Sequence, residues 1–186
     1  MPCAISRAMA HRYPVTWLMT DERLGDTLWR ALRALPPGSG VVFRHYATPR
    51  RARHALLRRL WRLTRARRLV LVVARGPAIG EGRHAAPCSA GLTTWPAHDD
   101  REAIIASRAG ADMLFVSPVH PTRSHPGEGA LGAGRAARIG SRLDLPRIAL
   151  GGMDARRFRR LRGFHGWAAI DAWRPCPDQK RKAVPR

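Results

Sequence analysis

The sequence predicts an α/β fold, a single compact (β/α)8 barrel (TIM barrel) with a shortened helical layer. Short apolar runs alternate with longer amphipathic stretches along the 186 residues, and this alternation is typical of parallel strands joined by helices. Most of the runs are continuously apolar, as expected for strands that are buried on both faces. Eight such runs, with a helix between most pairs, favour a closed barrel over an open sheet.

The expected strands comprise seven clear runs and one weaker run. The clear runs are 15–19, 40–43, 69–73, 91–95, 113–117, 147–150 and 167–170, and the weaker one is 81–85. Amphipathic stretches predict helices over 22–35, 49–66, 99–109, 132–142 and 154–162. Almost no helix fits between residues 74 and 90, and little follows the last strand. We therefore expect the helical layer to be short at both places.

Capping residues predict where the first two helices begin. Thr20 or Asp21 can accept a hydrogen bond from the free backbone N–H groups of the first helix. Thr48 followed by Pro49 predicts a cap and a proline at the first helical position of the second.

The length of the chain is enough for one sizeable core and too short for two domains. We expect an N-terminal extension over 1–12 and a barrel domain over 13–175. The segment 176–186 is basic and has too few apolar residues to form a core, which predicts a disordered tail.

Composition limits the classes of function. The chain has 34 Lys and Arg against 13 Asp and Glu, a formal charge of +21 that can indicate nucleic-acid binding. The lysines are Lys180 and Lys182, which excludes a Schiff-base lysine inside the barrel. Three separate cysteines without a CxxC pair fit a reducing compartment and indicate neither disulfides nor zinc. No apolar run approaches membrane length, so we expect a cytoplasmic protein.

Groups that can hold an anion follow two of the later strands. In a (β/α)8 barrel the chemistry lies at the carboxyl ends of the strands, and phosphate binds after the last two. The strand at 113–117 leads into a loop with Thr122 and Ser124, and the strand at 147–150 ends in Gly151 and Gly152. Glycines let backbone N–H groups approach a ligand closely. These residues indicate a phosphate site, although a glycine pair also suits a plain turn.

Several segments together resemble the thiamine phosphate synthase/TenI family. Its GAD turn, PVFPT-like loop, strand ending in GG and GVAVIS-type last strand are matched by "GADMLFVSPVHPTRSHPGEGALG", "LPRIALGGMDARRFRRL" and "GWAAIDAW". "WLMTDERL" and "VVFRHY" resemble the first two strands of the family. "TTWPAHDDREAIIASRAGAD" is similar to its S-x-H segment and the helix that follows. The resemblance is most specific between residues 91 and 173.

The resemblance implies a transferase of thiamine biosynthesis. An aminopyrimidine methyl pyrophosphate loses pyrophosphate, and the nitrogen of a thiazole phosphate captures the resulting cation, with Mg²⁺ assisting. The resemblance places Arg44 at the pyrophosphate clamp. It gives phosphate-binding or pyrophosphate-binding roles to loop hydroxyls and backbone amides at Thr122, Ser124, Gly151, Gly152, Ile170 and Asp171.

Some positions depart from the family pattern. Tyr46 and His125 stand where the family has lysines, and Asp171 stands where it has a serine. A carboxylate at Asp171 would oppose a phosphate if it faced the phosphate cup. The strand-three N-D-R segment reads Val73-Ala74-Arg75, and the second magnesium aspartate has no counterpart in "GEGRHAAPCSAG". Mg²⁺ is therefore implied by the family without matching Asp ligands, and we assign no metal ligand.

Histidines offer an alternative chemistry. His98 lies in the S-x-H segment, His120 and His125 flank the Pro-Thr loop, and His45 follows the presumed clamp. Several of them at one barrel mouth would form a cationic or acid–base set, and the catalytic candidates are Arg44, His98 and His125. TenI-type thiazole tautomerases use such chemistry, although their typical strand-six histidine is Pro118 here. A tautomerase or a non-catalytic binder of thiazole or thiamine phosphate is thus an alternative to a synthase.

An Arg-rich nucleic-acid-binding protein is the alternative from another class. The segment 50–68 carries arginines around apolar residues at helical spacing, which predicts an outer barrel helix with an Arg face. No nucleic-acid-binding motif accompanies the charge, so we expect no nucleic-acid partner beyond non-specific attraction. The expected partners are small phosphorylated substrates, a thiazole phosphate and a pyrimidine pyrophosphate, and no membrane.

Overall fold

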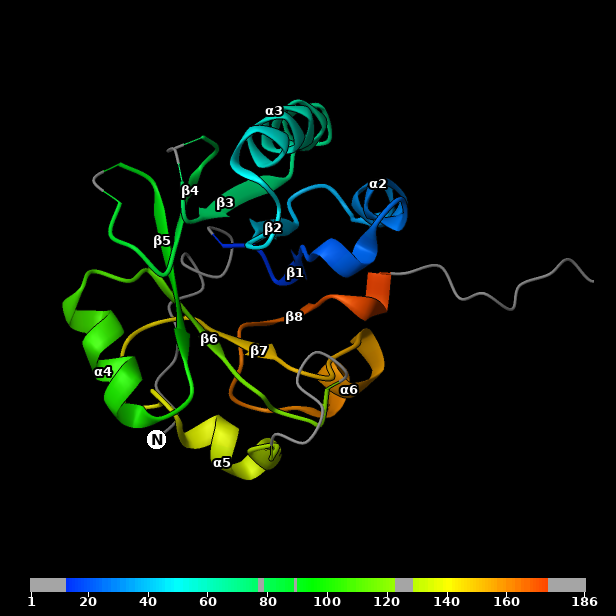
Figure 1. The fold of residues 1–186 in the computed structure, drawn as a ribbon. Helices are drawn as coiled ribbons and strands as arrows, with labels where there is room; N and C mark the ends of the chain where they lie inside the picture. The colour runs from blue at the N-terminus through cyan, green and yellow to red at the C-terminus, as the bar shows by residue number, and fades with distance from the viewer. Residues whose placement is uncertain (1–12, 77–78, 89, 123–128, 174–186) are drawn as a thin grey trace, which may run out of the picture.

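Eight parallel strands close into a barrel in chain order, and β8 pairs with β1 (Figure 1). The structure is a computed structural model that describes residues 13–76, 79–88, 90–122 and 129–173. The strands are β1 (Thr16–Met19), β2 (Gly40–Phe43), β3 (Val70–Ala74), β4 (Gly82–His84), β5 (Leu92–Ala97), β6 (Met113–Val116), β7 (Arg147–Leu150) and β8 (Gly166–Ala169). The predicted barrel is confirmed, and the weaker run at 81–85 forms β4.

Helices surround the strands in Figure 1. They are η1 (Glu22–Leu24), α2 (Thr27–Ala34), α3 (Arg50–Ala66), α4 (Asp100–Arg108), α5 (Gly132–Arg138), α6 (Ala155–Arg160) and η2 (Asp171–Trp173). The described residues between β3 and β5 contain no helix, which confirms the thin helical layer expected there. The extension over 1–12 and the tail over 176–186 lie outside the described residues.

The first expected helix, 22–35, is interrupted. It divides into η1 and α2, because Gly25 between them has a φ of 45° that a regular helix does not allow. The side chain of Asp21 accepts a hydrogen bond from the backbone N–H of Arg23, so the predicted cap at Asp21 is present. It serves the short η1 helix.

The expected start of the second helix is wrong. Pro49 itself occupies the cap position of α3, and the helix begins at Arg50. The hydroxyl of Thr48 instead donates to Oε1 of Glu22, at 3.2 Å. The side chain that suited a helix cap therefore joins the loop after β2 to η1.

Alternate residues of the last three strands pack into two separate cores. In β6, Met113 and Phe115 belong to the core that includes β1–β3, whereas Leu114 and Val116 pack with residues of α4 and α5. Trp17 is fully buried in the first core. Its ring packs directly against the backbone of Gly40, where a Cβ would lie only 2.1 Å from the ring. Phe115 meets Trp17 edge to face, with 5.2 Å between ring centroids. These rings close the lower interior and leave space at the carboxyl ends of the strands.

The Arg-rich segment forms the outer barrel helix that its spacing predicts. Leu57 and Leu60 of α3 are fully buried, and Arg59 lies over the ring of Trp29 with its guanidinium carbon 4.1 Å from the centroid. Its arginines thus partly cover neighbouring aromatic surface. Among the described helices, none is long and apolar enough to span a bilayer.

Candidate active site

Two neighbouring cavities in the described part of the barrel open where the strands end. The first, which we call the glycine pocket, has a volume of about 440 Å³ and lies between the loops after β6, β7 and β8. The second, the barrel-mouth pocket, has a volume of about 400 Å³ and includes Phe115 of the barrel interior. Both are lined by Thr122, Leu150, Gly151 and Ile170. The two cavities therefore border one another and can hold a ligand that has two parts.

The wall of the glycine pocket after β7 requires glycine. Gly151 and Gly152 have φ values of 95° and 58°, which side chains rarely adopt. A Cβ at Gly152 would also lie 2.6 Å from the carbonyl oxygen of Pro121 and 2.9 Å from Cβ of His120. The guanidinium of Arg157 donates to the carbonyl oxygen of Gly152. This side of the pocket is thus backbone at the two glycines, and beside it Arg157 forms a 3.9 Å ion pair with Asp154, which also lines the cavity.

The other side of the glycine pocket is formed by the end of β8. Ile170 is 8% exposed, and the half-buried Asp171 also lines the cavity. The pKa of Arg23 is raised, chiefly by its hydrogen bond to Asp21 and further by the charges of Asp21 and Asp171. The negative charge of Asp171 is therefore partly compensated by Arg23. Across the cavity lies Thr122, whereas Ser124 and His125 fall outside the described residues.

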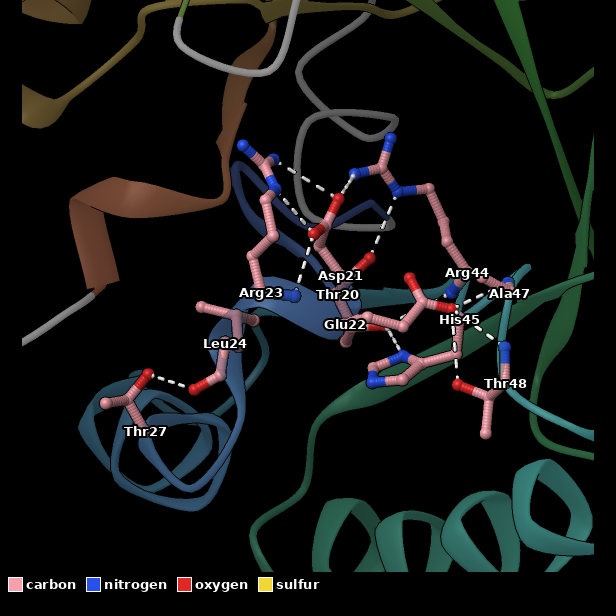
Figure 2. A network of polar contacts seen from close by, with 10 residues as sticks. All are labelled: Thr20, Asp21, Glu22, Arg23, Leu24, Thr27, Arg44, His45, Ala47 and Thr48. Carbon is pink, nitrogen blue, oxygen red and sulfur yellow. Dashed lines mark hydrogen bonds and ion pairs between the residues drawn. The ribbon is translucent and has the colours of Figure 1, made fainter.

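Arg44 lines the barrel-mouth pocket and is held by the loop after β1 (Figure 2). Its Nε donates to the carbonyl oxygen of Thr20 at 3.1 Å, and its Nη2 lies 3.3 Å from Oδ2 of Asp21. Burial lowers the pKa of Arg44, and the charge of Asp21 acts in the opposite direction. The remaining guanidinium nitrogen points away from Asp21 in Figure 2. Two nitrogens of Arg44 are thus held by Thr20 and Asp21, and the third is directed away from Asp21.

Asp21 is the shared acceptor of this arrangement. Its carboxylate also forms an ion pair with Arg23, at 2.7 Å from Nε to Oδ1. Burial acts to raise the pKa of Asp21, but the hydrogen bonds from Arg23 and the charges of Arg23 and Arg44 bring it below the ordinary value. The carboxylate is therefore ionised near neutral pH and keeps both guanidinium groups close to the mouth of the barrel.

The four histidines from the sequence do not all meet at the mouth. His98 lines the barrel-mouth pocket, where its Nδ1 lies 2.7 Å from Oε2 of Glu102. His45 is buried, stacks on Phe43 and shares a 3.0 Å hydrogen bond with the hydroxyl of Thr20. His120 lines neither pocket, and burial lowers its pKa. His45 thus supports the loop that carries Arg44.

A different histidine, His84 of β4, lines the barrel-mouth pocket. It is 6% exposed, its Nδ1 lies 2.8 Å from the hydroxyl of Thr94, and its ring meets Phe115 edge to face at 5.4 Å. Burial, together with the charge of Arg44, lowers the pKa of His84 to about 4. The sequence analysis missed this residue because it lies in the weakest predicted strand. The sequence did carry one signal for His84. Residues two apart on a strand point to the same face, so a polar ring at 84 shares a face with Gly82.

The residues of the barrel-mouth pocket do not fit a magnesium ion. Mg²⁺ requires oxygen ligands and is usually held by one or two carboxylates. The polar residues that line this pocket are Arg44, Tyr46, His84, His98, Ser117 and Thr122, and none of them is a carboxylate. No group of three or more His, Cys, Asp or Glu suited to a metal occurs in the described part of the chain. We therefore assign no step of a reaction to a metal ion.

Comparisons with known proteins agree with the barrel fold and with the resemblance found in the sequence. Residues 89–173 match the model of the TMP-TENI family, described as thiamine monophosphate synthase. This match covers a little under half of the chain, and it agrees with the resemblance to the thiamine phosphate synthase/TenI family. Over 54 residues the chain is 43% identical to a thiamine-phosphate synthase of Methanospirillum hungatei JF-1. That alignment spans 28% of this chain and 26% of the relative, so it covers about a quarter of each protein.

Solved structures of similar proteins share the fold. A thiamine phosphate pyrophosphorylase of Pyrococcus furiosus superposes with a TM-score of 0.73 at 20% identity, covering 88% of both chains. A thiamine phosphate pyrophosphorylase of Bacteroides thetaiotaomicron gives a TM-score of 0.55 at 18% identity, covering 89% of both chains. At these identities the likeness concerns the barrel alone.

Proposed function

We propose that the protein is a cytoplasmic transferase of thiamine phosphate synthase type, which joins an aminopyrimidine methyl pyrophosphate to a thiazole phosphate. The observation that carries the proposal is the pair of bordering cavities, one walled by glycine backbone and the other containing Arg44. Two anionic substrates need two sites that touch, so that the reacting atoms can meet. The similarity of residues 89–173 to the thiamine monophosphate synthase model supports the choice of substrates.

The glycine pocket suits the phosphate of the thiazole. Backbone N–H groups exposed by glycines bind phosphate well, because no side chain keeps the anion at a distance. The guanidinium of Arg157 lies beside this wall, and Thr122 also lines the pocket. The pocket carries the negative charge of Asp171 as well, which Arg23 partly offsets. The backbone wall and Arg157 together favour the phosphate.

The barrel-mouth pocket suits the pyrimidine and its pyrophosphate. Its lining is largely apolar, with Met19, Pro96 and Phe115 offering contacts to a flat ring. Arg44 provides the fixed cation for the pyrophosphate. In the reaction, the bond from the methylene carbon to the pyrophosphate oxygen breaks, and pyrophosphate leaves with the electron pair. The lone pair of the thiazole nitrogen then forms the new carbon–nitrogen bond.

A coupling assay tests this proposal. Purified protein is incubated with an aminopyrimidine methyl pyrophosphate and a thiazole phosphate, with Mg²⁺ or with EDTA, and thiamine phosphate is quantified by chromatography. We expect product that depends on enzyme and on both substrates. Absence of product with and without Mg²⁺, from protein that binds both substrates by calorimetry, would contradict the synthase proposal.

A second candidate is a TenI-like tautomerase or a binder of thiazole or thiamine phosphate. The lack of carboxylates among the described residues of the barrel-mouth pocket favours it, because a synthase that uses Mg²⁺ would need such ligands. The same preparation distinguishes the two candidates. Tight binding of thiazole phosphate or thiamine phosphate without any coupling, together with proton exchange on the thiazole ring, would support the tautomerase.

A further inference from the structure

Arg53 of α3 is a half-buried cation that the function proposed above does not use. Its guanidinium carbon lies 4.7 Å from the centroid of the Phe43 ring. Among the described residues, those that line the two pockets do not include Arg53. Burial lowers the pKa of Arg53, because the guanidinium loses part of its hydration. A cation in this position needs acceptors from the protein in place of water.

Three backbone carbonyl groups accept hydrogen bonds from this guanidinium. Its Nε donates to the carbonyl oxygen of His45 at 3.0 Å, and its Nη2 donates to those of Arg44 at 3.1 Å and Ala74 at 2.5 Å. Arg44 and His45 directly follow β2, whereas Ala74 is the last residue of β3. The paired register of these two strands ends at Phe43 with Val73. The guanidinium therefore joins the two strand ends beyond their last pair.

The backbone at both strand ends has a conformation that side chains rarely adopt. His45, which follows Arg44, has a φ of 33°. Arg75, which follows Ala74, has a φ of 55°. Residues other than glycine seldom have a positive φ, because Cβ then crowds the backbone, and such conformations persist where surrounding contacts hold them. The hydrogen bonds from Arg53 supply contacts of this kind at both places.

The backbone of Arg44 is held through both of its polar groups. Its N–H donates to the hydroxyl of Thr20 at 3.1 Å, and its carbonyl oxygen accepts from Arg53. Because a side chain is placed only as precisely as the backbone that carries it, these two contacts limit the directions that the Arg44 guanidinium can take. Arg44 lines the barrel-mouth pocket, so the contact with Arg53 reaches that pocket from behind.

We propose that Arg53 is a positioning residue, which joins the ends of β2 and β3 and thereby holds Arg44 in the orientation that binds pyrophosphate. Arg53 acts through Arg44 and does not itself touch the anion. The geometry of the guanidinium matters as much as its charge, because its planar fork reaches carbonyl groups of two strands at once and an ammonium group does so poorly. This inference rests on the proposed function, since it takes the pocket that contains Arg44 as the pyrophosphate site.

Calorimetric titration of the full-length protein with inorganic pyrophosphate tests the role of Arg53. Arg53→Met keeps an unbranched side chain beside Phe43 and removes the guanidinium, and we expect it to bind pyrophosphate about tenfold more weakly than wild type. Arg53→Lys should lose nearly as much, although it keeps the charge. Both variants should bind thiazole phosphate as wild type does. Arg58→Met, at an exposed position of the same helix, is the matched control and should bind both ligands normally.

A double-mutant cycle distinguishes positioning from a general structural role. In an Arg44→Ala background, the further change Arg53→Met should weaken pyrophosphate binding little, because the group that Arg53 positions is already absent. The same loss in both backgrounds would overturn the inference, since Arg53 would then contact the anion or support the barrel as a whole. Wild-type affinity in Arg53→Lys would also overturn it, because charge alone would then suffice.

The outcomes separate this inference from the proposed function. Wild-type protein that binds pyrophosphate without forming thiamine phosphate contradicts the synthase proposal, and the cycle still decides the role of Arg53. Wild-type protein that does not bind pyrophosphate overturns the inference, and the coupling assay then decides the synthase proposal by itself. Circular dichroism shows whether each variant is folded. If Arg53→Met fails to fold, the same cycle with Arg53→Lys in its place gives the answer.

Discussion

The glycine pocket and the barrel-mouth pocket border one another, yet they are built in different ways. One wall of the glycine pocket is backbone at Gly151 and Gly152, whose positive φ values and close neighbours leave no room for a side chain. The polar groups of the barrel-mouth pocket are side chains, chiefly Arg44, His84 and His98. Backbone geometry depends on a few glycines and on the fold, whereas each side chain can change by one substitution. The sequence departs from the family pattern in both pockets, at Asp171 in the first and at Tyr46 in the second, whereas the glycine pair is kept.

Gly152→Glu should have the largest effect, because it places bulk and negative charge where the phosphate would bind. Its Cβ alone would come within 2.6 Å of the carbonyl oxygen of Pro121. We expect the affinity for thiazole phosphate to fall at least ~100-fold by isothermal titration, a loss of roughly 3 kcal/mol. Gly134→Glu, at a glycine of α5 with open space around it, is the control and should bind as wild type. Unchanged binding by Gly152→Glu would mean that the phosphate lies elsewhere.

Arg44→Ala should separate the two pockets. It removes the fixed cation of the barrel-mouth pocket, so we expect pyrophosphate to bind about 30-fold more weakly, in line with roughly 2 kcal/mol for a hydrogen bond to a charged group. The affinity for thiazole phosphate should change less than threefold, since the glycine pocket does not contain Arg44. Arg59→Ala, on the outer face of α3, serves as the control. Equal losses for both ligands would show that the pockets are one undivided anion site.

Acid should destabilise the folded protein in part through His84 of the barrel-mouth pocket. Its pKa is about 4 in the folded protein against an ordinary value of 6.5, so the unfolded chain binds the proton first as the pH falls. Stability is therefore lost between pH 6.5 and pH 4. We expect His84→Gln to lose about 2 kcal/mol less unfolding free energy than wild type between pH 7.5 and pH 5, measured by urea denaturation. Identical losses would indicate that His84 is protonated in the folded protein.

Thr122→Ala should have the smallest effect on binding, because it removes a single hydroxyl from a wall that both pockets share. We expect a loss of about 1 to 2 kcal/mol in the affinity for thiazole phosphate, by titration calorimetry. Thr122→Ser should restore most of it. A loss as large as that of Gly152→Glu would show that side chains, and not backbone, dominate the glycine pocket.

The sequence predicted the barrel more fully than the site. Apolar runs revealed seven of the strands clearly, because parallel strands buried on both faces leave that pattern in one short segment, whereas β4 left only the weaker run at 81–85. Thr48 was wrongly assigned to a helix cap, because its actual partner, Glu22 of η1, is distant in the chain and cannot be found from local pattern. His84 was missed for a similar reason: its partners Thr94 and Phe115 come from other strands. Local pattern predicts elements, whereas a side chain's role depends on contacts that only the closed barrel creates.

The packing of Trp17 against Gly40 and Phe115 has a consequence for the order of events in catalysis. These rings fill the interior below the barrel-mouth pocket, so ligands of the described site enter and leave at the carboxyl ends of the strands. Two substrates and two products would then use one entrance beside the shared residues Thr122, Gly151 and Ile170. Whichever molecule binds second covers the one that arrived first. An enzyme with this shape would follow an ordered kinetic scheme, in which the last molecule to bind or form limits the release of the other.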